Sequence, residues 1–137
     1  MIIQEMNETL LFDAGEPNPF SQYFIGQSYL NMLTPGPNAI GNVTFEPGCR
    51  NHWHAHAGGQ LLLVTAGEGY YQAEGKLAQR LKAGDVVVIP AGVKHWHGAA
   101  EDSWFVHLAA VGDPSKPETE WYEPVNDDQY AEANKIK

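Results

Sequence analysis

The chain has 137 residues, which is enough for about one domain with a hydrophobic core of its own. Seventeen acidic residues against eight basic ones give a net charge of -9, and without a local cluster of Lys or Arg this argues against binding to nucleic acid. The single cysteine, Cys49, excludes a disulfide within the chain and fits a reducing compartment.

The first residues give no sign of a targeting or membrane segment. They read MIIQEMNE, which lacks a basic stretch followed by an apolar core, and no apolar run approaches the length of a membrane span. The sequence therefore predicts a cytoplasmic protein that does not contact a membrane.

Residues 1–27 are expected to form an N-terminal arm that packs on the domain or on a partner subunit. A turn at residues 15–19 (GEPNP) is followed by the apolar side chains of Phe20, Tyr23, Phe24 and Ile25. The arm and the next predicted strand carry more apolar surface than one small barrel can cover. This predicts a homodimer.

Residues 28–111 predict a barrel of short antiparallel strands. Turn-forming Gly and Pro residues recur at short intervals, and no helical period appears between them. The segments 61–64 (LLLV) and Val86–Ile89 (VVVI) are apolar at every position, so both faces of these strands are expected to be covered. The expected strands span 28–33, 40–46, 60–66, 70–73, 77–81, 86–89 and 104–111.

Residues 112–137 turn polar and are expected to form a C-terminal extension of a single domain. Asn126 is a good N-cap for a short final helix over Asp127–Asn134. Asp127 and Asp128 then lie in the first turn, where the helix dipole favours negative charge.

Five of the six histidines lie between residues 48 and 98, and the sixth is His107. Residues two apart on a strand share a face, so His54 and His56 point one way, as do His95 and His97. A single His-x-His pair is more often a surface pair or two structural histidines. Two such pairs, together with His107, favour a metal site.

Two segments resemble the two sequence motifs of the cupin superfamily. The fixed residues of the first segment are Gly48, His54, His56, Gln60 and Gly67, and those of the second are Gly84, Pro90, Gly92 and His95. The resemblance implies an all-β fold, a cupin-type double-stranded β-helix or jelly-roll barrel. It also implies a divalent metal held by His54, His56, Gln60 and His95, with one or two positions left open for substrate or water.

Two residues depart from the common cupin pattern, which has Glu at the position of Gln60 and often Asn at the position of Ala99. The amide of Gln60 keeps an oxygen ligand but removes one negative charge. We expect a bound ion to be a stronger Lewis acid and to bind more weakly. Manganese is expected first, and iron, cobalt, nickel or zinc also suit this set of ligands.

A narrower resemblance concerns small cupins that include manganese-dependent hydroxynitrile lyases, and cupins found with carboxymuconolactone decarboxylase proteins. It rests on the segments WHAH (53–56), GQ (59–60), KHWHGAA (94–100) and HLA (107–109). In the lyase-type cupins two histidines beside the metal assist proton transfer, which implies catalytic roles for His97 and His107. The resemblance therefore implies cleavage or synthesis of cyanohydrins, small hydroxy compounds derived from carbonyls.

Other interpretations remain open. The protein is alternatively a non-catalytic cupin that senses or stores a small ligand, or a metal-dependent oxidase. His97 and His107 are alternatively a rim residue and a hydrogen-bonded core histidine. Cys49 fits a small buried apolar residue better than a ligand, and His52 fits the surface or the pocket mouth.

Overall fold

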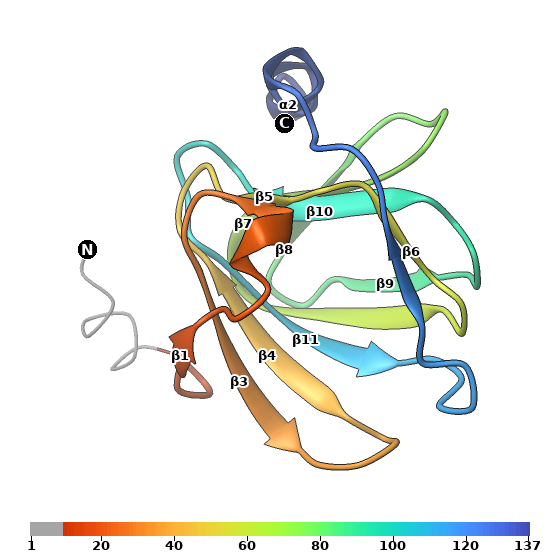
Figure 1. Ribbon diagram of the computed structural model, residues 1–137. Helices are drawn as coiled ribbons and strands as arrows, with labels where there is room; N and C mark the ends of the chain where they lie inside the picture. Colours follow the sequence, from red (N-terminus) through yellow and green to blue (C-terminus); the bar gives the residue numbers. More distant parts are fainter. Residues whose placement is uncertain (1–9) are drawn as a thin grey trace.

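The computed structural model describes residues 10–137. The first nine residues of the predicted N-terminal arm, 1–9, lie outside the described residues. The described chain forms an all-β barrel of two curled sheet layers with one short α-helix (Figure 1). Its elements are β1 (Glu16–Pro17), η1 (Ser21–Tyr23), β2 (Phe24–Ile25), β3 (Ser28–Thr34), β4 (Ile40–Phe45), β5 (Arg50–Asn51), β6 (His54–His56), β7 (Gln60–Ala73), β8 (Gln79–Lys82), β9 (Val86–Ile89), β10 (His95–Ala99), β11 (Phe105–Val111), β12 (Thr119–Trp121) and α2 (Asp127–Asn134).

The long strand β7 joins the two layers. Its first half pairs with β11 and β9, and its second half pairs with β10 and β8. The sequence predicted two strands here with a turn at residues 67–69, and that prediction is wrong. Gly67 instead has a φ of +73°, and a Cβ there would overlap the carbonyl oxygen of Trp104. The glycine therefore lets the strand bend from one sheet into the other beside a neighbouring backbone.

Four other predicted strands of the barrel are confirmed within one or two residues at each end: β3, β4, β9 and β11. One layer runs in the order β1, β3, β4, β11 and β7, with β9 beyond β7. The described part of the arm adds β1 to the edge of β3 and β2 to the edge of β5. The arm thus joins the edge strands of the two layers.

The C-terminal helix α2 begins as predicted. Asn126 Oδ1 accepts a hydrogen bond from the Gln129 backbone N–H at 2.8 Å, and Gln129 Oε1 accepts one from the Asn126 N–H at 3.0 Å. This reciprocal capping box satisfies two of the backbone donors at the start of the helix. Among residues 10–137 there is no helix long and apolar enough to cross a membrane.

Two apolar clusters hold these layers together. One fills the barrel and includes Phe45, Leu62, Ile89 and Phe105. The other lies between the barrel and α2, and its buried members are Trp53, Tyr70, Ala78, Trp96, Ala100, Val125, Tyr130 and Ala133. Trp53 and Trp96 therefore pack outside the barrel, beside the C-terminal helix.

The expectation that β7 and β9 are covered on both faces is wrong for the chain alone. Leu61 pairs with Val88 and Leu63 pairs with Val86, so these four side chains share the outer face. Both leucines are 36% exposed, Val86 is 61% exposed and Val88 is 68% exposed. Alternation along the strands sends Leu62, Val87 and Ile89 into the core, and no described segment covers the other face.

Candidate metal centre

A cavity of about 290 Å³ opens into the barrel. Five side chains on its wall can bind a metal or form hydrogen bonds: Asn51, His54, His56, Gln60 and His97. His107 lines it as well, from β11. The rest of the wall is largely apolar and includes Phe20, Phe24, Leu30, Met32, Val43, Ala109, Val111 and Trp121. Among the described residues that line this cavity there is no Lys, Arg, Asp or Glu. The cavity therefore suits an uncharged ligand with an apolar group.

Strand pairing explains why histidines from distant segments meet. His95 of β10 lies opposite His54 of β6, and the centroids of the two rings are 4.2 Å apart. The ring of His56 lies 5.0 Å from that of His54 and 5.5 Å from that of His95. Residues two apart on a strand share a face, and strand pairing brings the two strands together, so these imidazoles lie on the same side.

Three of the histidines have Nδ1 within hydrogen-bond distance of an oxygen atom: His54, His56 and His95. His54 Nδ1 donates to the His52 carbonyl at 2.8 Å, and His95 Nδ1 donates to the Val93 carbonyl at 2.9 Å. His56 Nδ1 lies 3.0 Å from Thr119 Oγ1. Where Nδ1 carries the proton, Nε2 carries the lone pair, which is the tautomer that a metal ligand requires.

Three buried atoms near this wall lack a hydrogen bond of normal geometry: His56 Nε2, His95 Nε2 and Gln60 Oε1. Buried polar atoms are rarely left in this state unless a ligand or ion satisfies them. The residues predicted as ligands therefore fit a metal ion by the chemistry of their donor atoms. By distance alone, however, a different set of histidines is grouped: His54, His95 and His97 each offer a ring nitrogen, and these three nitrogens lie within 4.8 Å of one another.

His97 and His107 form a second group. His107 Nε2 lies 3.1 Å from His97 Nδ1, and both rings are buried. Asn51 Nδ2 lies 3.2 Å from each nitrogen of the His97 ring. His107 Nδ1 has no hydrogen bond of normal geometry. These two imidazoles thus contact each other at the cavity wall.

Burial keeps all of these imidazoles neutral near pH 7. It lowers the pKa of His95 and of His107 to about 4, and it lowers the pKa of His54 and of His97 well below the usual 6.5. The pKa of His56 also falls through burial, and the nearby side chain of Gln60 partly offsets this. Neutral imidazole is the form that binds a metal or accepts a proton.

Some residues considered from the sequence lie elsewhere. Arg50 bonds the Val125 carbonyl and Asp127, and Gln72 bonds Lys76 and Trp96, so neither side chain lines the cavity. Cys49 is fully buried in the barrel core, and burial raises the pKa of its thiol to about 12, which disfavours a role as a ligand. His52 does not line the cavity.

Sequence reasoning missed Asn51, Thr119 and Trp121. All three line the cavity, and Trp121 lies with its ring centroid 4.8 Å from that of His54. Thr119 and Trp121 belong to β12, which pairs with β6 across more than sixty residues of sequence. No local pattern signals a contact of that range.

Comparison with known proteins agrees with this architecture. Residues 41–111 match the family model described as Cupin domain. The chain belongs to the cupin family. This cupin is 41% identical over 114 residues to an (R)-mandelonitrile lyase from Granulicella tundricola, which covers 80% of the chain and 87% of that enzyme.

Solved structures are similar as well. A cupin-like protein from Thermotoga maritima is 41% identical, covers 93% of this cupin and 98% of its own chain, and superposes with a TM-score of 0.88. A Klebsiella pneumoniae protein with a double-stranded β-helix domain is 20% identical and has a TM-score of 0.62, over 90% of this chain and 96% of its own. The latter likeness concerns the fold alone.

Proposed function

We propose that this cupin is a metal-dependent hydroxynitrile lyase that cleaves and forms cyanohydrins of small, uncharged carbonyl compounds. The observation that carries the proposal is a cluster of five histidines: four of them line one cavity, and the fifth, His95, packs against His54. Three of the five have Nδ1 within hydrogen-bond distance of an oxygen, which leaves Nε2 for a metal, and the other two contact each other. The 41% identity to a mandelonitrile lyase supports the same reaction class.

The ligands in this proposal are His54, His56 and His95 through Nε2 and Gln60 through Oε1. The unpartnered buried atoms of His56, His95 and Gln60 support this set. His97 lies close enough to bind, but its ring already contacts Asn51 and His107. Manganese is the first candidate, with iron, cobalt, nickel or zinc as alternatives, and the ion would supply positive charge that stabilises negative charge developing on the substrate oxygen.

His97 and His107 would move the protons. Cleavage of a cyanohydrin removes the hydroxyl proton, forms the carbonyl and breaks the bond to the nitrile carbon, which leaves with the electron pair. A neutral imidazole can accept the first proton, and the imidazolium formed can return a proton to cyanide. Both rings are neutral before reaction because burial lowers their pKa values, and the pair provides an acceptor and a donor at the same wall.

The remaining wall would bind the carbonyl substituent. Phe24, Leu30, Met32 and Val43 face the cavity and offer an apolar surface to an aryl or alkyl group. The lack of charged residues among the described lining residues argues against carboxylate substrates. We therefore propose an aromatic cyanohydrin such as mandelonitrile as the test substrate.

The test measures turnover of mandelonitrile by the metal-loaded protein. His97→Ala and His107→Ala should keep their metal and lose about 10²- to 10⁴-fold in kcat, the usual contribution of general acid and base catalysis. His52→Ala is the matched control, since this histidine lies outside the cavity, and it should retain activity. Wild-type turnover by metal-loaded double mutants would show that the two histidines are structural.

The same experiment separates the alternatives. A protein that binds metal and benzaldehyde, as a shift in melting temperature, but turns over no cyanohydrin would be a non-catalytic ligand-binding cupin. Oxygen consumption with a hydroxy compound would instead identify a metal-dependent oxidase.

A further inference from the structure

Asn51 has an unusual position for a polar residue without an assigned role. It is 2% exposed and lies on β5, a strand of only two residues. Its Oδ1 accepts a hydrogen bond from the backbone N–H of His97 at 2.9 Å. Its Nδ2 lies 3.2 Å from both nitrogens of the imidazole of the same residue. One side chain thus contacts the backbone and the ring of one histidine.

The backbone contact fixes which end of the amide meets the ring. Because a backbone N–H can only donate, the atom that meets it must be the oxygen, and the amino group must be turned to the imidazole. The amino group lies at the same distance from both ring nitrogens, so it faces the ring and does not single out one nitrogen. Asn51 therefore holds the orientation of the His97 ring through its backbone bond and this contact.

The position of Asn51 is itself held from outside the barrel. Arg50, the preceding residue, donates to the Val125 carbonyl at 3.0 Å and lies 3.1 Å from Asp127 Oδ1, at the start of α2. Its guanidinium also lies 4.3 Å from the centroid of the Tyr130 ring. The strand that carries Asn51 is therefore tied to the C-terminal segment by a buried bond to Val125 and by contacts to Asp127 and Tyr130 of the helix.

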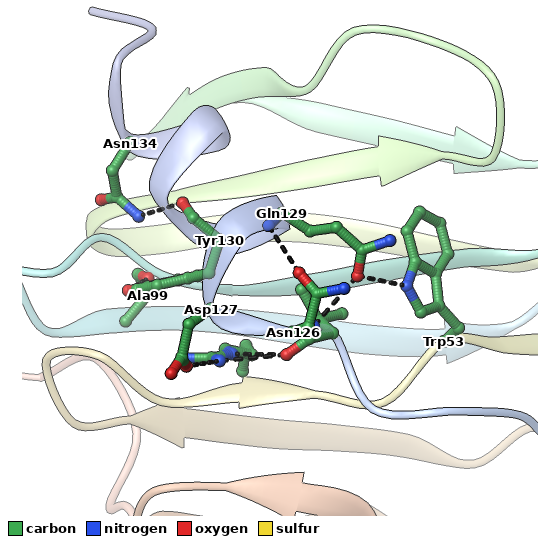
Figure 2. A network of polar contacts seen from close by, with 9 residues as sticks. Trp53, Ala99, Asn126, Asp127, Gln129, Tyr130 and Asn134 are labelled. Carbon is green, nitrogen blue, oxygen red and sulfur yellow. Dashed lines mark hydrogen bonds and ion pairs between the residues drawn. The ribbon is translucent and has the colours of Figure 1, made fainter.

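The same helix holds the strand that carries His97. Tyr130 donates a hydrogen bond to the carbonyl of Ala99, two residues beyond His97, at 2.6 Å. Figure 2 shows the Tyr130 side chain extending from the helix toward Ala99. Gln129 of the same helix accepts from the Trp53 indole at 3.3 Å. Both partners in the Asn51–His97 contact thus lie on strands that one outer element fixes.

We propose that Asn51 is a positioning residue for the proposed lyase reaction. It holds the His97 imidazole in a single orientation, in which His97 Nδ1 lies 3.1 Å from His107 Nε2. The inference rests on the proposed function for its effect on rate, although its effect on the ring does not depend on any substrate. Loss of comparable outer contacts typically costs 10- to 100-fold in activity.

Asn51→Asp is the most informative variant. It has almost the same shape and keeps an oxygen acceptor for the His97 backbone N–H, but it presents a second oxygen to the ring where the amino group was. The His97 ring should therefore lose its contact with the amino group and face a negatively charged oxygen instead. We expect kcat to fall by about 10- to 100-fold, with KM and metal content within about threefold of wild type.

Two further variants separate positioning from a purely structural role. Asn51→Ala removes both contacts and should lower kcat in the same range. Asn42→Ala is the control, because Asn42 is also a buried strand asparagine, 1% exposed, and it bonds the Asp13 carbonyl away from the histidines. It should lose stability in urea to a similar degree as Asn51→Ala while keeping wild-type kcat.

The decisive readout is the nitrogen NMR spectrum of ¹⁵N-histidine-labelled, zinc-loaded protein, taken beside kinetics on mandelonitrile. The proposal expects the His97 ring signals to change in Asn51→Asp and to stay unchanged in Asn42→Ala. Unchanged ring signals in both Asn51 variants would overturn it, as would a kcat within twofold of wild type in an active enzyme. If wild type does not turn over mandelonitrile, the proposed function fails, and the ring signals alone decide the role of Asn51.

Discussion

Gln60→Glu tests how the proposed site balances charge. The change is nearly isosteric, and it places a carboxylate where a buried amide oxygen has no hydrogen bond of normal geometry. The histidines around it are neutral, and no charged side chain lines the cavity among the described residues. The new carboxylate would therefore be the sole negative charge facing a bound divalent ion.

The magnitude follows from two opposing effects. A unit negative charge about 4 Å from a divalent cation gains roughly 8 kcal/mol at an effective dielectric constant of about 20. Burying the carboxylate takes back several kcal/mol. A remainder of at least about 1.4 kcal/mol would make metal binding at least about tenfold tighter. In the absence of metal the same carboxylate is unpaired, so the metal-free variant should melt below wild type.

Chelator competition and melting temperature measure both effects. The metal-induced rise in melting temperature should be larger for Gln60→Glu than for wild type. Gln72→Glu is the matched control, because Gln72 lies on the same strand outside the cavity, and its metal affinity should not change. Equal or weaker metal affinity in Gln60→Glu would refute the reasoning.

Three further predictions concern other contacts. Thr119→Val removes the hydroxyl beside His56 Nδ1 and should weaken metal binding by about two- to fivefold in chelator competition. The reason is that one partly exposed hydrogen bond contributes about 0.5 to 1 kcal/mol. An unchanged metal affinity would argue that Thr119 does not anchor His56. We predict a homodimer that uses the exposed apolar face of β7 and β9. Light scattering should give about twice 15.1 kDa for wild type and the mass of a monomer for Val88→Asp. A monomeric wild type would disprove the dimer. Tyr130→Phe removes the buried bond to the Ala99 carbonyl and should cost about 1 to 3 kcal/mol of unfolding free energy in urea, and a loss below about 0.5 kcal/mol would count against that bond.

Much of the fold could be predicted because its signals are local. The strands β3 and β4 follow from alternating apolar residues bounded by turn residues, and the capping of α2 follows from Asn126 and the acidic first turn. The course of β7 could not be predicted, because Gly67 reads as a turn residue in the sequence. Its role depends on Trp104, which approaches it only in the folded barrel.

The site divides in the same way. The shared faces of His54 with His56 and of His95 with His97 follow from the two-residue period of a strand. The contacts of Thr119 with His56 and of Asn51 with His97 join residues 63 and 46 positions apart. They depend on strand pairing and on the path of the C-terminal segment, and no local pattern specifies either.

The most direct test of the account is the metal content of purified variants from unsupplemented medium. Elemental analysis should find one divalent metal per chain in wild type and in His97→Ala, and close to none in the His54→Ala/His95→Ala double variant. Such a result would place the ion on the histidines whose Nδ1 atoms donate to backbone carbonyls. One metal per chain in the double variant, or its loss in a folded His97→Ala protein, would contradict the proposed ligand set.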